Sequence, residues 1–229
     1  MIHLYDDLHP IKQIQYLIEE LTYLPPKLRE KPTGISALVN KFYSNVRPLV
    51  QRCKDFNNLS TDVCHTLMKN NTSLAGCLNA LFLYREFSFS KYPFIKSSSL
   101  SLDGDEITNQ ADQQVELFDP NGNLIKILML ILCFSSNTSV VQFDPTDDYQ
   151  SFSNSIGGID TQNFYITVFW KYLLYLYGFK QAVLRFSSLI KRIVDLIYLV
   201  GLLSEHQAFN QMLRNVVSSL NQSLTIGDK

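Results

Sequence analysis

The stretch FYITVFWKYLLYLYGFKQAVLRFSSLIKRIVDLIYLVGLL, residues 164–203, decides the fold. Its first part is apolar on nearly every side, because only Thr167 and Lys171 interrupt the run from Phe164 to Tyr177. A helix that is apolar all round is typical of a buried position. We therefore expect residues 164–177 to lie at the centre of a helical core.

The second part of the stretch has helical periodicity with one polar side. Its apolar residues recur at steps of three and four: Phe179, Val183, Phe186, Ile190, Ile193, Val194, Ile197 and Val200. Its polar residues share the other side: Lys180, Arg185, Ser188, Lys191, Arg192 and Asp195. The pattern predicts two packed helices joined at Gly178, with Ile190 buried and Lys191 exposed.

The rest of the chain predicts further helices with clear punctuation. One helix begins at Pro10 and ends at Pro25-Pro26, since proline suits a first helical turn but cannot continue a helix. A second covers 35–56, with a kink or break near Ser44 caused by Pro48. Ser60 or Thr61 caps the next helical region, which we expect as two helices separated at 70–73, with one long helix as the alternative. Asn123 caps a short buried helix ending at Phe134, and a last helix follows Ser204.

These helices predict an all-α fold, an irregular multi-helix bundle of about seven helices with two long polar or acidic loops. The first loop, 96–122, is Ser-rich and acidic and has few apolar groups to bury. The second covers 135–160. We expect an N-terminal helical region at 1–95 and a C-terminal helical region at 123–229, packed together as one domain.

Composition narrows the functional class. Hydrophobic residues make up 46% of the 229-residue chain and charged residues 18%, so a sizeable core forms beneath a surface poor in charge. Residues 1–95, 96–160 and 161–229 carry net charges of +3, −8 and +4. Neither helical region has the basic excess typical of a nucleic-acid-binding protein. The N-terminus has no secretory signal and no run is long enough to cross a bilayer, so we expect an intracellular protein, cytoplasmic or nuclear and not secreted.

Motifs that would indicate chemistry are missing from the sequence. The four cysteines, Cys53, Cys64, Cys77 and Cys133, fall on apolar helical faces and lack the close spacing of zinc ligands, so we expect them buried and reduced. No hydrolase, kinase, dinucleotide-binding or metalloprotease motif occurs. We therefore predict no catalytic residue, no metal site, no cofactor and no enzymatic activity.

The aromatic segment 87–94 has two interpretations. Phe87, Phe89, Tyr92 and Phe94 alternate with polar residues, as in a short strand or in a strip that stacks on single-stranded nucleic acid. The other interpretation is that these rings cover the edge of the core. We favour the second, because the segment offers little positive charge.

The sequence favours a non-catalytic helical subunit or adaptor of a larger intracellular complex, acting through protein–protein interaction. Tyr165, Tyr172 and Tyr175 are the predicted partner-binding residues, since tyrosine is enriched at interfaces. The alternative is a peripheral membrane or lipid-binding domain that uses the cationic face formed by Lys180, Arg185, Lys191 and Arg192. A third hypothesis is single-stranded nucleic-acid binding by 84–96.

Overall fold

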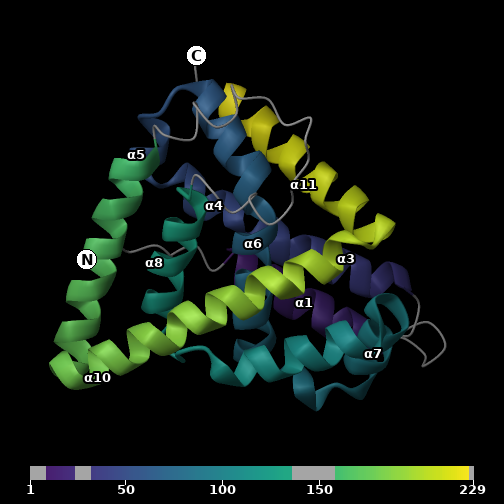
Figure 1. The fold of residues 1–229 in the computed structure, drawn as a ribbon. Coiled ribbons are helices and arrows are strands. Elements are labelled where there is room, and N and C mark those ends of the chain that lie inside the picture. Colours follow the sequence, from purple (N-terminus) through teal and green to yellow (C-terminus); the bar gives the residue numbers. More distant parts are fainter. Residues whose placement is uncertain (1–8, 24–31, 136–157, 227–229) are drawn as a thin grey trace.

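The computed structural model describes residues 9–23, 32–135 and 158–226, and this part of the chain is helical without any strand. The helices are α1 (His9–Tyr23), α3 (Pro32–Ser44), α4 (Val46–Gln51), α5 (Lys54–Asn57), α6 (Thr61–Glu86), the 3-10 helix η1 (Phe89–Lys91), α7 (Pro93–Leu117), α8 (Gly122–Cys133), α10 (Ile159–Ser204) and α11 (Gln207–Ile226) (Figure 1). The all-α multi-helix prediction is confirmed. The buried core contains side chains from Ile14 to Val216.

The central element is α6, which contacts α3, α7, α8, α10 and α11. Ser60 caps it, since its hydroxyl accepts a hydrogen bond from Val63 N at 3.4 Å. The predicted break at 70–73 is wrong and the single long helix is right. Two polar side chains explain this result, because Asn71 donates to the Cys133 and Ser135 carbonyls and Thr72 donates to the Met68 carbonyl.

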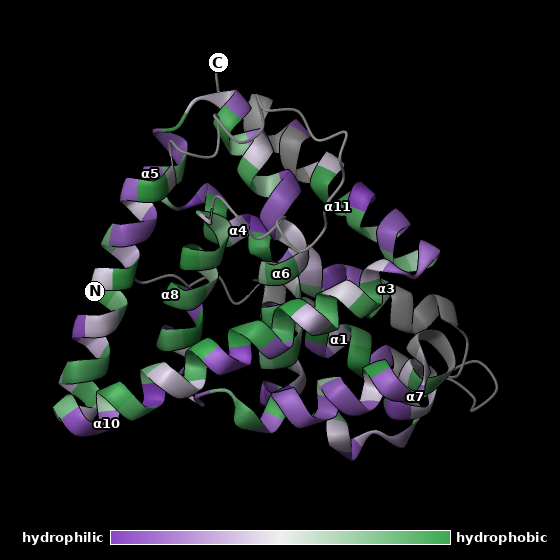
Figure 2. Cartoon of the chain, viewed as in Figure 1, coloured by the Kyte–Doolittle hydropathy of each residue, from purple (hydrophilic) through white to green (hydrophobic). Residues whose placement is uncertain are grey.

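The most apolar helix is α8, which packs on α6 and α10 (Figure 2). Nine of its twelve residues, among them Leu124 and Leu128, are buried. Its cap is Asn121 and not the predicted Asn123: the Asn121 side-chain oxygen accepts from Asn123 N at 3.0 Å and Leu124 N at 3.3 Å. A helix without a polar face is stable only between other elements, which is its position here.

The predicted break caused by Pro48 is confirmed. One helix ends at Ser44 and the next begins at Val46. Proline has no N–H to donate four residues back, so the helix cannot continue unperturbed through this turn. Beside the break, the Asn79 side chain of α6 donates to the Phe42 carbonyl at 2.6 Å and satisfies a backbone acceptor inside the core.

The predicted acidic loop at 96–122 is wrong, because most of it belongs to α7. This helix begins at Pro93 and changes direction at Gly104, where φ is +82°. Ile107 and Val115 are buried on its inner face, so a few apolar side chains at helical spacing hold an otherwise polar helix to the core. The second predicted loop, 135–160, lies almost wholly outside the described residues.

The prediction of two helices joined at Gly178 is confirmed. Gly178 has φ +69° inside α10 and divides it into a first arm, 159–177, and a second arm, 179–204 (Figure 1). The expectation that 164–177 lies at the core centre is wrong: Phe169 points inward, while Phe164 and Tyr175 are exposed. The first arm is an edge of the molecule, packed on α8 through contacts such as the Gln162 side chain with the Ile131 carbonyl.

Candidate interaction surface

The three predicted partner-binding tyrosines lie in different environments on the first arm of α10. Tyr165 is only 7% exposed, so the expectation that it belongs to an exposed patch is wrong. Its hydroxyl donates to Asp55 Oδ2 at 2.7 Å and lies 3.3 Å from Cys53 Sγ. Burial and these two neighbours raise the pKa of Tyr165, so it stays protonated and acts as a structural tie between α5 and α10.

The other two tyrosines remain candidates for contact with a partner. Tyr175 is 83% exposed, and Tyr172 is half-buried with its ring stacked on Tyr175 at 6.4 Å between centroids. Asn123 lies 3.5 Å from the Tyr172 hydroxyl, which fixes that ring at the edge of α8. A binding role for Tyr172 and Tyr175 stays a prediction.

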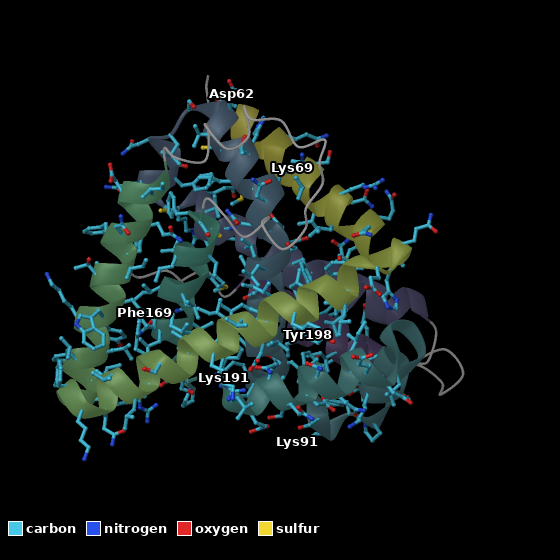
Figure 3. The ribbon with its side chains drawn as sticks, viewed as in Figure 1. Asp62, Lys69, Lys91, Phe169, Lys191 and Tyr198 are labelled. Atoms are coloured by element: carbon cyan, nitrogen blue, oxygen red, sulfur yellow. The ribbon has the colours of Figure 1, made fainter. Side chains whose placement is uncertain are left out.

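A larger apolar surface lies on the second arm, and we call it the α10 stripe. Its members range from 39% exposed (Val183) to 71% exposed (Phe179); they are Phe179, Val183, Leu184, Ile190, Val194 and Tyr198. At 100° per residue these positions fall within about 140° of the helix circumference, so they share one face, and Lys180, Ser187 and Lys191 lie within the same arc. The labelled residues Lys191 and Tyr198 both project from this arm (Figure 3).

The α10 stripe corrects the predicted orientation of the second arm. Leu189 is 8% exposed and Ile190 is 46% exposed, so the prediction that Ile190 is buried is wrong, while Lys191 is exposed as expected. The buried face consists of a second apolar series: Ala182, Phe186, Leu189, Ile193, Leu196 and Val200. Tyr198 was absent from the predicted series, although it lies four residues after Val194. Leu184 was absent as well, and no spacing of three, four or seven residues connects it to Ile190 or Val194.

The charges beside the α10 stripe are fewer than the sequence implied. Arg185 pairs with Asp119 at 2.6 Å, and Arg192 pairs with Asp195 at 2.9 Å. Lys180 and Lys191 are exposed and have no ion-pair partner in the described part of the chain. The predicted cationic face of four residues is therefore reduced to two lysines adjoining an apolar surface.

The bend that orients this surface is held by Asp119. Its carboxylate accepts from the Tyr177 hydroxyl at 3.2 Å and from Arg185 at 2.6 Å, so one side chain contacts both arms of α10. The Arg185 guanidinium also lies 3.9 Å from the centre of the Tyr177 ring, a cation–π contact. Arg85 of α6 donates to the Asp119 carbonyl at 3.1 Å and connects the bend to the core.

The potentially reactive thiols of the protein are buried. All four cysteines are buried free thiols, as predicted, and burial raises the pKa of Cys133 from 9.0 to about 12, which keeps it a thiol. The described residues contain no cluster of three or more His, Cys, Asp or Glu placed to hold a metal. In the same residues, every helix is too short or too polar to span a bilayer.

The aromatic segment 87–94 covers the core edge, as favoured above. Phe89 is fully buried in η1, with ring contacts to Phe42, Tyr84, Phe87 and Tyr92 at 5.4–6.5 Å between centroids. A ring enclosed by four others offers no face for a base. The strand alternative is wrong.

Comparisons of the chain with protein-family models, curated proteins and solved structures found no match.

Proposed function

We propose that this protein is a non-catalytic helical subunit of a larger complex, and that it binds an amphipathic helix of a partner protein along the α10 stripe. The observation that carries the proposal is the exposure of six large apolar side chains on one face of an ordered helix. Monomeric proteins rarely leave a large apolar patch uncovered. The stripe also has the helical spacing that a helix-in-groove or helix-on-helix contact uses.

The free energy available from burying the α10 stripe is large enough for a specific interface. Completing the burial of a half-exposed Leu, Ile or Phe side chain is worth roughly 1 kcal/mol, so six give about 6 kcal/mol before the cost of association. Tyr175 and Phe164, on the first arm of α10, are exposed as well. A partner that reaches both arms would gain further contacts.

Charge complementarity selects the chemistry of the partner. Lys180 and Lys191 lie beside the α10 stripe and form no ion pair within the described residues, which favours a partner helix with acidic flanks; Glu106, which accepts from the Tyr198 hydroxyl at 3.5 Å, places one carboxylate near the end of the stripe. The membrane alternative is less favoured, because recognition of anionic lipid generally uses clusters of about 4–8 basic residues. With Arg185 and Arg192 already paired, two lysines fall short of that number. The nucleic-acid alternative is less favoured, because Phe89, the central aromatic residue of 84–96, is buried in the core and cannot stack on a base.

The test uses a synthetic amphipathic helical peptide of leucine and glutamate, with a lysine-for-glutamate version as its charge control. We expect the acidic peptide to bind at least about tenfold more tightly than the basic one. Ile190→Asp should weaken this binding by about tenfold or more, because it places a carboxylate in the stripe. Gln181→Asp is the matched control: it adds the same charge at an exposed position outside the stripe and should change little.

Three outcomes would overturn the proposal: no binding of the acidic peptide, equal binding of both peptides, or equal effects of the two variants. Co-sedimentation of the wild-type protein, but not Ile190→Asp, with vesicles of phosphatidylserine and phosphatidylcholine would establish the membrane alternative. Circular dichroism of both variants checks that they fold.

A further inference from the structure

An apolar pocket lies where five helices meet. It has a volume of about 230 Å³, and α3, α6, α7, α10 and α11 all contribute lining residues. Each of these helices places a buried apolar side chain in the wall: Phe42, Leu81, Ile107, Leu199 and Phe209. A mainly apolar pocket with few polar groups is the usual form of a small-molecule site.

The lining residues differ in their exposure to solvent. Ala208 is exposed, and Ser99 and His206 are half-buried, whereas lining residues such as Phe42 and Leu199 are buried. The accessible residues mark the rim of the pocket, and the buried residues form its inner walls. A ligand can therefore place an apolar part against the inner walls and leave a polar end in water at the rim.

The inner polar groups of the pocket are already engaged or covered. The Tyr84 hydroxyl hydrogen-bonds to the Asp112 carboxylate, and burial together with this carboxylate raises the pKa of Tyr84 to about 12. Thr108 also lines the pocket, but its hydroxyl oxygen is buried and cannot be reached by a ligand. Contact with the inner walls therefore depends on apolar surface and not on a hydrogen bond.

The charges of the pocket favour a neutral ligand. Asp112 is the one carboxylate among the described lining residues, and these residues include no lysine or arginine. Lys96 pairs with Asp112 at 2.8 Å and neutralises it. The pocket therefore offers no unpaired cation to hold an anionic ligand, and its carboxylate already has a partner.

The volume sets the length of the apolar part. An engineered apolar cavity of about 150 Å³ binds benzene, which corresponds to roughly 25 Å³ for each carbon atom. At that ratio a volume of 230 Å³ holds about nine carbon atoms. We propose that this pocket binds the hydrocarbon chain of a neutral, single-chain amphiphile, with about nine carbon atoms inside and the polar end in water at the rim.

The test is a series of straight-chain primary alcohols from butanol to dodecanol. The full chain is refolded from denaturant to remove any bound molecule and is titrated by calorimetry. We expect the affinity to rise about three- to fourfold for each added methylene up to about nine carbon atoms, and to stay nearly constant beyond that length. An open apolar surface would set no such limit. Octanoate, which has the chain length of octanol and a charge, should bind no more tightly than octanol.

Two leucine variants locate the site. Ala111→Leu enlarges a lining residue, so the affinity should stop rising at a chain about two or three carbon atoms shorter than in the wild-type protein. Ala37→Leu is the matched control: it adds the same atoms at an exposed position of α3 that does not line the pocket, and it should leave the series unchanged. Circular dichroism of both variants checks that they fold.

Absence of binding by the wild-type protein would overturn the proposal, as would an affinity that keeps rising to dodecanol or equal effects of the two leucine variants. Tighter binding of octanoate than of octanol would refute the neutral ligand. Ile190→Asp lies outside the pocket and should bind the alcohols like the wild-type protein. Loss of alcohol binding in Ile190→Asp would instead place the alcohols on the α10 stripe, so the two proposals fail separately.

Discussion

Replacing Thr108 by valine should stabilise the protein, whereas the same change at Thr72 should destabilise it. Both side chains are buried, at 5% and 0% exposure, and both belong to helices. They differ in one respect: Thr72 Oγ1 donates to the Met68 carbonyl at 2.6 Å, and Thr108 Oγ1 has no partner in the described part of the chain. Valine has nearly the same shape as threonine and a similar helix propensity, so the difference isolates the hydroxyl.

The magnitude follows from the two environments. A buried hydroxyl without a partner costs about 1–3 kcal/mol, so Thr108→Val should raise the free energy of unfolding by about 1 kcal/mol. Loss of a satisfied buried hydrogen bond costs about 0.5–1.5 kcal/mol, so Thr72→Val should lower it by about 1 kcal/mol. In a chain of this length the resulting gap of about 2 kcal/mol corresponds to roughly 4–8 °C in Tm.

Urea unfolding followed by circular dichroism, on protein refolded from denaturant, measures both values. Equal destabilisation by the two variants would refute the reasoning, since it would mean that the Thr108 hydroxyl is hydrogen-bonded or solvated in the native protein. Stabilisation by both would also refute it, because it would show that the added methyl group outweighs the hydroxyl at either position. Only opposite signs agree with the geometry.

Two further predictions follow from packing and from burial. Gly76→Ala should destabilise the protein by several kcal/mol, because a Cβ there would lie 2.9 Å from Tyr43 Cγ and closer to other ring atoms. Gly201→Ala, in open space on α10, should instead stabilise the protein by about 0.4–1 kcal/mol. Thermal unfolding of the two variants measures both effects. Burial raises the pKa of Cys133 from 9.0 to about 12, so the folded state holds the thiol proton more tightly than the unfolded state. The contribution of Cys133 to the free energy of unfolding is therefore fully present below pH 9. It is lost between pH 9 and 12, at up to about 1.4 kcal/mol per pH unit. Urea titrations at pH 8 and pH 10.5 should show this loss in the wild-type protein and a smaller one in Cys133→Ala; parallel loss in both would contradict it.

Local chemistry made part of the fold predictable. The bend at Gly178 and the break before Pro48 each depend on one residue, through a positive φ that glycine accepts and through a missing N–H. The burial of the four cysteines followed from their apolar faces. These features hardly depend on what the rest of the chain does.

The errors occurred where two faces competed or where few residues carried the signal. In the second arm of α10 both Leu189 and Ile190 belong to apolar series at helical spacing, so periodicity alone could not select the buried one. In the part of α7 that was predicted as a loop, the inner face is formed mainly by Ile107, Ala111 and Val115. The polar and acidic composition of 96–122 therefore favoured a loop over a helix. The unsatisfied hydroxyl of Thr108 could not be predicted, because it depends on the backbone angles of Gly104, four residues earlier, which turn the usual carbonyl acceptor away from the helix.

The bend at Gly178 also determines the dimensions of the molecule. A straight helix of the 46 residues of α10 would be about 69 Å long, whereas a compact domain of this chain length has a diameter of only about 45 Å. Divided at Gly178, the arms measure about 29 Å and 39 Å, and each fits along one edge. A continuous rod would carry the buried face of its second half past the end of its own core, where the surface of another copy would be the nearest cover. One left-handed residue thus keeps the longest helix within the outline of a single chain.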